Sequence, residues 1–249
     1  MPSTPKDLTP KDRLAVALDL PSEHEAMKLV DRLGNICQWY KVGMELYYAA
    51  GNSIVQQLRD RGFNVFLDLK LHDIPNTVAG AVRSATHAGA SLLTIHATGG
   101  AAMMHAAAEA ASAPGSPRLV AVTVLTSMDA NELAGIGITV SPADQVLRLA
   151  TLAQASGIDG MVCSPEEVAI LRKETGSHTL LVIPGIRPTG SAVQGAFGDD
   201  QKRIATPAQA IRAGASMLVV GRPITRAQDP AAAAHAILQE IEHAQTAAR

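Results

Sequence analysis

The sequence predicts an α/β protein built as one closed (β/α)8 barrel, the TIM-barrel fold, with a single domain. Eight short apolar segments alternate with stretches rich in Ala, Leu and Glu, which is the pattern of a parallel sheet with connecting helices. In addition, the segment HAGASLLTI at 87–95 resembles RAGASMLVV at 212–220, half the expected architecture away. Such an internal repeat favours a closed eight-stranded barrel over an open sheet.

The expected strands are apolar runs of similar length. They are RLAVALDL (13–20), WYKVGMEL (39–46), FNVFLDLKL (63–71), SLLTIHA (91–97), RLVAVTVLTS (118–127), DGMVCSP (159–165), LLVIPGI (180–186) and MLVVGRP (217–223). No linker that would separate a second domain interrupts this series, so we expect one barrel domain over residues 13–249.

Helices between the strands are marked by start and stop signals. Ser22 followed by Glu25 fits a capping box, and Gly34 provides a stop for the same helix. Further pairs place a cap residue before a proline that suits the first helical position: Ser141-Pro142, Ser164-Pro165, Thr206-Pro207 and Asp229-Pro230.

Composition argues against several classes of function. The 249 residues carry a net charge of −2 and only 3% aromatic residues, so we expect no nucleic acid polymer as a partner. No apolar run approaches the roughly 20 residues of a membrane-spanning helix, so we expect no membrane partner. Cys37 and Cys163 lie outside any CxxC motif and are expected to be free thiols in the cytoplasm. Residues 1–12, MPSTPKDLTPKD, lack a signal-peptide core and are expected to form a disordered leader.

The third expected strand carries charges on one of its faces. Side chains alternate across a strand, so its leucines at 67, 69 and 71 point one way while Phe66, Asp68 and Lys70 point the other. The leucines should pack against the outer helices, which leaves Asp68 and Lys70 facing the barrel interior. Buried charges are unfavourable unless they pair or take part in chemistry. This strand therefore predicts a functional site.

Other polar residues lie where the strands end, and such residues face the mouth of a barrel. They are Asp19, Lys41, Asp73, His96, Thr126 and Ser127. Lysines among acids would form an alternating charge network in which each ion is partly compensated.

Simpler interpretations of these residues remain open. Asp73 could cap the next helix, and Asp19 or Lys41 could be a satisfied interior ion. His96 is expected to be a hydrogen-bonded residue at a strand end. His72 alternates with Asp73 along the chain and could face away from the site.

The last two strands predict a phosphate site. PGIRPTG follows the seventh strand and GRPIT ends the eighth, and these two loops frequently bind phosphate in barrels. Gly185 and Gly221 would let backbone N–H groups approach an anion, and Arg187 and Arg222 are suited to phosphate oxygens. The alternative is a pair of surface arginines beside turn glycines. The glycine-rich stretch 188–201 is either a slack loop or a lid.

Taken together, FLDLKLHDIPNT, ALDL, VTVLTS, PGIRP and GRPIT resemble the orotidine 5′-phosphate decarboxylase family, of the bacterial type. The resemblance runs from about Arg13 to Ile241. It implies a carboxy-lyase that converts orotidine 5′-phosphate to uridine 5′-phosphate and CO2, the final step of de novo pyrimidine biosynthesis. It implies no metal and no cofactor.

The resemblance also implies roles for particular residues. Lys70 matches the family's proton donor, and Lys41, Asp68 and Asp73 match the rest of its charge network. The positions that match substrate contacts are Asp19 and Lys41 for the ribose, Thr126 and Ser127 for the pyrimidine, Arg187, Gln201, Gly221 and Arg222 for the phosphate, and Ile74, Asn76 and Thr77 of the HDIPNT motif. Gln194 is the alternative to Gln201. The family is homodimeric with shared active sites, and Asp73 and Ile74 match residues that reach the neighbouring subunit's site.

Two other functions compete with this one. The Asp-x-Lys-x-x-Asp core is shared with related sugar-phosphate lyases, some of which use magnesium and carry an acid on the second strand. Here Lys41 occupies that place, and an ammonium would repel a metal ion. A non-catalytic sensor of phosphate ligands is the second alternative, and the intact Asp68, Lys70 and Asp73 argue against it.

Overall fold

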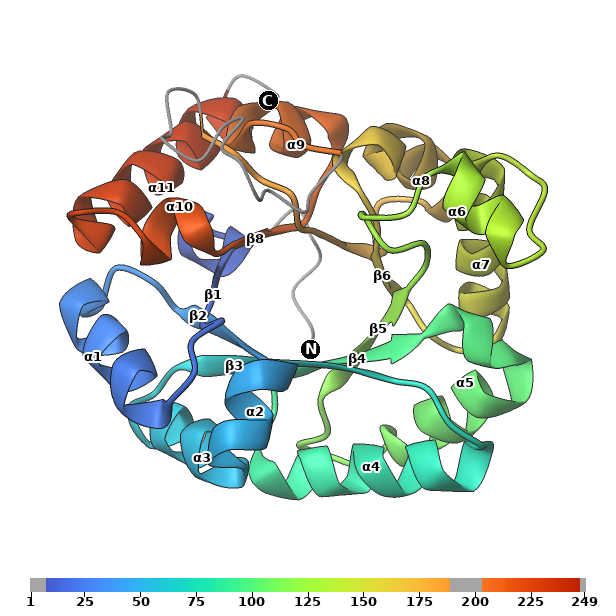
Figure 1. Cartoon of the computed structure of the whole chain (residues 1–249), viewed down its shortest axis with the longest axis horizontal. Coiled ribbons are helices and arrows are strands. Elements are labelled where there is room, and N and C mark those ends of the chain that lie inside the picture. The colour runs from blue at the N-terminus through green and yellow to red at the C-terminus, as the bar shows by residue number, and fades with distance from the viewer. Residues whose placement is uncertain (1–7, 189–202, 247–249) are drawn as a thin grey trace.

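The computed structural model describes residues 8–188 and 203–246, and within them eight parallel strands close into a barrel. Each strand pairs with the next, and β8 pairs with β1, so the sheet has no free edge (Figure 1). The strands are β1 (Leu14–Ala17), β2 (Trp39–Gly43), β3 (Asn64–Leu71), β4 (Leu92–His96), β5 (Arg118–Val122), β6 (Gly160–Val162), β7 (Leu180–Ile183) and β8 (Met217–Val220). The predicted (β/α)8 fold is confirmed.

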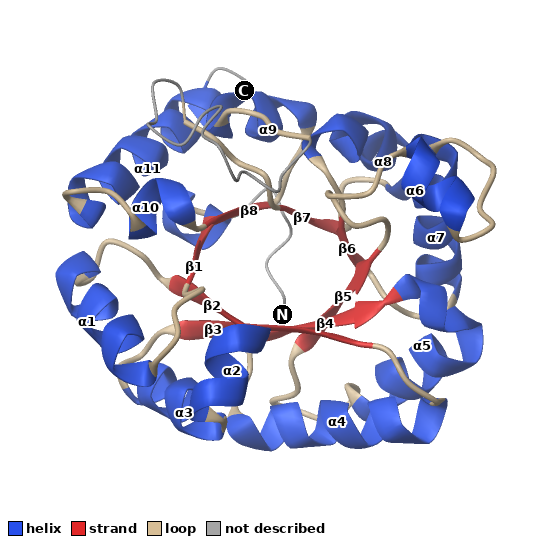
Figure 2. Ribbon diagram, viewed as in Figure 1, coloured by secondary structure: helices blue, strands red, loops and turns tan. Residues whose placement is uncertain are grey.

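Helices form a ring around the outside of this barrel (Figure 2). They are α1 (Glu23–Leu33), α2 (Met44–Ala50), α3 (Asn52–Asp60), α4 (Pro75–Ala88), α5 (Gly100–Ala110), α6 (Ala130–Gly135), α7 (Pro142–Ala155), α8 (Val168–Thr175), α9 (Pro207–Ala213), α10 (Arg222–Thr225) and α11 (Pro230–Thr246). Three short 3-10 helices accompany them: η1 (Pro10–Arg13), η2 (Ala97–Gly99) and η3 (Pro165–Glu167). None of the helices in the described ranges is long and apolar enough to cross a bilayer.

Alternation along the strands divides the core into two layers. Phe66 belongs to a cluster inside the barrel, whereas its neighbour Leu67 belongs to the larger cluster between strands and helices. Leu69 and Leu71 pack against the same outer cluster. The prediction that the β3 leucines face the helices is therefore confirmed, and the opposite face of β3 is left for the interior.

The internal repeat is a structural repeat as well. Gly89 ends α4 and Gly214 ends α9, both in the left-handed conformation that glycine adopts without strain. The serine two residues after each glycine then binds the preceding strand in the same way. The backbone N–H of Ser91 donates to Val65 and that of Ser216 donates to Leu181, at 2.8 and 2.9 Å. Equivalent units thus lie half the barrel apart.

The predicted helix starts are present. Ser22 Oγ accepts a hydrogen bond from the backbone N–H of Glu25, and Gly34 ends α1 with a φ of 53°. Ser141, Ser164 and Thr206 also cap their helices through side-chain oxygens, each before a proline. Asp229 Oδ1 accepts from the N–H of Ala232 in the first turn of α11, at 3.0 Å. These caps fix where each helix leaves the barrel.

The described chain begins with ordered structure ahead of β1. Thr9 and Asp12 form a capping box around η1, and Lys11 Nζ donates to the carbonyl of Asn35 at 2.8 Å. Gln245 of α11 donates to the carbonyl of Leu8 at 3.1 Å. Residues 8–12 of the expected leader therefore contact the barrel, and residues 1–7 lie outside the described residues.

Candidate active site

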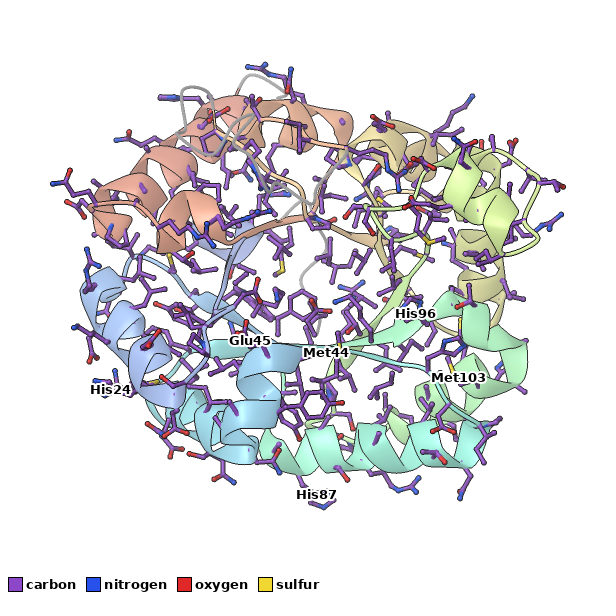
Figure 3. The ribbon with its side chains drawn as sticks, viewed as in Figure 1. His24, Met44, Glu45, His87, His96 and Met103 are labelled. Atoms are coloured by element: carbon purple, nitrogen blue, oxygen red, sulfur yellow. The ribbon has the colours of Figure 1, made fainter. Side chains whose placement is uncertain are left out.

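A cavity of about 940 Å³ opens at the carboxyl ends of the strands. Its floor comes from interior strand residues such as Phe66, Val122 and Val182. Among the residues predicted from the sequence, those lining it are Asp19, Lys41, Asp68, Lys70, Thr126, Ser127, Gly185, Arg187, Gly221 and Arg222. Met44 and Glu45 at the start of α2 line it too, and both lie at the inner edge of the helix ring (Figure 3). The barrel therefore brings distant polar residues into one site.

Asp68 lies between two lysines in this cavity. Its Oδ1 accepts from Lys70 Nζ at 2.9 Å, and its Oδ2 lies 3.4 Å from Lys41 Nζ. Lys41 Nζ also donates to Asp19 Oδ1 at 2.8 Å. The four side chains form an alternating chain of acid and base from the segment after β1 across β2 to β3. Exposure rises from Lys41 (9%) and Asp68 (13%) to Lys70 (29%), so the ammonium of Lys70 is the more accessible of the two.

The pairing determines the charge states of the buried members. Burial by itself would lower the pKa of Lys41, but the carboxylates of Asp68 and Asp19 outweigh burial and raise that pKa. Burial would raise the pKa of Asp68, but Lys41 and Lys70 outweigh it and lower that pKa. Both groups are therefore charged at neutral pH.

Gly43 provides room for this network. Its position on β2 is level with Asp68 on β3. A β carbon on Gly43 would lie 2.9 Å from Asp19 Oδ1 and 3.0 Å from Lys41 Nζ, which is closer than side-chain carbons normally approach. A side chain at this position would therefore force the end of Asp19 or Lys41 to shift.

The loop after β3 lies outside the cavity of its own chain. Residues 72–77 are exposed, including Asp73, Asn76 and Thr77. Ile74 is 68% exposed although it is a large apolar residue. Asp73 Oδ1 accepts from the N–H of Ile74 at 2.6 Å. The N-cap of α4 is Ile74, with no side-chain capping bond, so the interpretation of Asp73 as a helix cap is wrong. Its carboxylate is hydrogen-bonded to the residue that precedes the helix, and Asp73 is exposed.

The two histidines near this loop lie against each other. The rings of His72 and His96 are 5.4 Å apart and tilted by 30°, with His96 at the end of β4 (Figure 3). Burial lowers the pKa of His96, and His72 and Lys70 lower it further. His96 is therefore neutral at pH 7 and packs beside the charged network.

Two arginines from the loops after β7 and β8 also line the cavity. Arg187 is buried, at 5% exposure, and Gly185 before it has a φ of 74°. The backbone N–H of Arg187 donates to Ala205 at 2.9 Å, which fixes this loop. Arg222 begins α10 directly after Gly221. The sequence left open that Arg187 and Arg222 are surface residues. For Arg187 this interpretation is wrong, because its side chain is buried.

Parts of the expected phosphate site lie outside the described residues. These are Gln194, Gln201 and nearly all of the stretch 188–201. Within residues 8–188 and 203–246, no group of three or more His, Cys, Asp or Glu side chains is arranged to hold a metal ion.

Comparison with known proteins gives a consistent result. The model of the "Orotidine 5'-phosphate decarboxylase / HUMPS family" matches residues 12–237. The chain belongs to this family. A protein of Halorhodospira halophila named orotidine 5'-phosphate decarboxylase is 55% identical over 231 residues, covering 92% of this chain and 95% of its own. One of the same name from Actinobacillus succinogenes is 52% identical, covering 88% and 93%.

A solved structure agrees with this assignment. The crystal structure of orotidine 5'-phosphate decarboxylase from Lactobacillus acidophilus superimposes with a TM-score of 0.81 at 41% identity. It covers 92% of this chain and 99% of the other. Family membership therefore extends over the barrel and all the motifs on which the resemblance was based.

A buried ion pair near the candidate active site was not predicted from the sequence. Arg203 and Glu167 are 8% and 3% exposed, and Arg203 Nη1 donates to Glu167 Oε1. The second carboxylate oxygen accepts from the hydroxyl and the N–H of Ser164. Arg203 Nη2 donates to the carbonyl of Leu125 at 3.0 Å, next to Thr126. The capping-box spacing of Ser164 and Glu167 was a signal for part of this cluster, but nothing in the sequence pairs Glu167 with Arg203.

We predict that Glu167→Ala lowers the free energy of unfolding by about 3 kcal/mol or more, because it leaves the Arg203 guanidinium buried without its counter-ion. Asp31→Ala is the matched control, since it removes the exposed Arg61–Asp31 pair (2.5 Å; 44% and 63% side-chain exposure). This control should change stability by less than about 1 kcal/mol. Urea unfolding at neutral pH measures both free energies, and equal losses would show that Arg203 does not depend on Glu167 as its counter-ion.

Proposed function

We propose that the protein is a carboxy-lyase that converts orotidine 5′-phosphate to uridine 5′-phosphate and CO2, the final step of de novo pyrimidine biosynthesis. The observation that carries this proposal is the Lys70 ammonium held by Asp68 in a cavity that Arg187 and Arg222 also line. Family membership supports the same reaction.

The charged network supplies what this reaction needs. Loss of CO2 from C6 of the pyrimidine leaves an electron pair in the plane of the ring, where the ring π system cannot delocalise it. A fixed ammonium beside C6 stabilises that charge as it develops and then donates a proton to it. Lys70 is the proton donor in our proposal, because it is the more accessible lysine. Asp68 holds it in place, and Lys41 keeps Asp68 ionised.

The remaining polar residues bind the substrate. Asp19 and Lys41, which are hydrogen-bonded to each other, contact the ribose. Thr126 and Ser127 meet the pyrimidine, and Arg187, Gly221 and Arg222 bind the phosphate together with Gln201. Charge complementarity supports this arrangement, because a phosphate dianion matches two guanidinium groups. Binding energy from the phosphate is available to hold the ring against Lys70.

No metal and no organic cofactor take part in this mechanism. Lys41 supports this, since its ammonium lies between Asp19 and Asp68 and occupies the place from which an acid could bind a divalent cation. The same position argues against the magnesium-dependent sugar-phosphate lyase as the alternative function. We place the reaction in the cytoplasm, and the buried unpaired thiols Cys37 and Cys163 fit a reducing compartment.

The active form in this proposal is a homodimer with shared sites. Asp73 and Ile74 are exposed beside the cavity, and Asp73 makes no described contact with Lys70 of its own chain. A large apolar side chain that is 68% exposed is suited to burial against a partner. Asp73, Ile74 and the neighbouring Asn76 and Thr77 would thus complete the site of the second subunit.

We predict that the purified protein decarboxylates orotidine 5′-phosphate after exhaustive chelation. Loss of absorbance of the orotidylate ring measures the reaction, and a Lys70→Ala variant is the inactive control. Activity that disappears on chelation and returns with magnesium would overturn metal independence. A wild-type protein that binds orotidylate without turning it over would be the non-catalytic sensor.

We also predict complementation between two inactive variants. Lys70→Ala and Asp73→Ala homodimers should each be nearly inactive. In a mixed dimer one site has both lesions and the other has neither, so co-refolding should restore about a quarter of wild-type activity for random pairing. Mixtures with proven subunit exchange that stay inactive would show that each site is built within one chain.

A further inference from the structure

The backbone of Lys70 has an unusual conformation. Among the described residues it is the one non-glycine residue with a positive φ, 50°. It lies where the pairing of β3 with β4 shifts: β3 advances from Leu67 to Leu71 while β4 advances only from Leu93 to Ile95. A left-handed conformation is unfavourable for a residue with a β carbon. Specific contacts must therefore hold Lys70 in it.

Thr94 on β4 makes those contacts. It is fully buried, with 0% exposure. Its hydroxyl accepts a hydrogen bond from the backbone N–H of Lys70 at 2.8 Å and donates one to Asp68 Oδ1 at 3.0 Å. The same Asp68 oxygen accepts from Lys70 Nζ at 2.9 Å. A closed ring of hydrogen bonds therefore joins the backbone of Lys70, Thr94, Asp68 and the ammonium of Lys70.

One hydroxyl thus fixes both ends of the same lysine. A hydroxyl has one proton to donate and lone pairs to accept, and Thr94 uses both functions here. Without it, the N–H of Lys70 would lose this acceptor where the strand backbone is strained, and Asp68 would lose one of the bonds that orient its carboxylate. Thr94 is not among the residues that line the cavity, so it acts through Lys70 and Asp68.

We propose that Thr94 is a positioning residue for decarboxylation, which holds the left-handed backbone of Lys70 and the carboxylate of Asp68 so that the Lys70 ammonium meets C6 of the substrate. This inference rests on the proposed role of Lys70 as the proton donor. It extends the site from the residues that touch substrate to one behind them.

Isosteric substitution separates this role from simple packing. Thr94→Val keeps the shape and removes the hydroxyl, and Thr94→Ser keeps the hydroxyl and removes a methyl group. For orotidine 5′-phosphate we expect Thr94→Val to lower kcat about 10- to 100-fold, because small displacements of a catalytic group have effects of that size. KM should stay within about threefold, since the arginines are untouched, and Thr94→Ser should keep kcat within about threefold of wild type.

Thr94→Ala provides a second comparison if Thr94→Val does not fold. Ala and Ser both lack the methyl group and differ only in the oxygen, so Ala should show the loss of kcat and Ser should not. Rates are compared per folded protein, measured by near-ultraviolet circular dichroism. A hydroxyl-free variant with wild-type kcat would overturn the proposal, as would equal losses in Ser and Ala or a rise in KM alone.

A crystal structure of the Val or Ala variant gives a readout that does not depend on turnover. We expect φ of Lys70 to leave the left-handed region or its Nζ to separate from Asp68 Oδ1. An unchanged Lys70 would overturn the positioning role even if the wild-type enzyme is active. A wild-type protein without decarboxylase activity would instead refute the proposed function, whatever the geometry of the variant.

Discussion

The placement of one carboxylate, Asp68, between two ammonium groups is the interaction on which the site depends. An isolated buried lysine would tend to lose its proton, and an isolated buried aspartate would tend to gain one. Here each group reverses the effect of burial on the other, as the raised pKa of Lys41 and the lowered pKa of Asp68 indicate. The network can therefore stay ionised above an apolar cluster that fills the barrel interior.

The barrel provides this arrangement through its topology. Parallel strands bring their carboxyl ends to the same rim, so Asp19, Lys41 and Asp68 meet although they come from three strands or strand ends. Below them, Phe66 and the other interior residues fill the barrel and exclude water. The loops after β7 and β8 contribute Arg187 and Arg222 at the same rim. A rigid apolar scaffold thus holds a small polar site in one geometry.

Much of this could be predicted from the sequence because it follows from periodicity. Alternation on β3 placed Asp68 and Lys70 inside, and the repeat of Ala-Gly-Ala-Ser marked equivalent turns. The left-handed φ of Lys70 could not be predicted, since it arises from a register shift between two strands. Thr94 lies on the same face of β4 as Leu92 and His96, so alternation along the strand could have placed it inside the barrel. Its hydrogen bonds to Lys70 and Asp68 depend on the register shift and could not be predicted. Glu167 and Arg203 are 36 residues apart and meet only in the folded barrel.

The central claim is that an ammonium at position 70 carries out the reaction, and chemical rescue tests it most directly. Lys70→Cys should be nearly inactive, and alkylation with 2-bromoethylamine should restore a substantial fraction of activity, since it rebuilds a side chain of the same length with a terminal ammonium. Cys37 and Cys163 are buried, and burial raises the pKa of each thiol, so they should react slowly. Iodoacetamide, which adds a neutral group, is the control and should restore nothing. Equal rescue by both reagents, or complete aminoethylation at position 70 without any return of activity, would contradict the account.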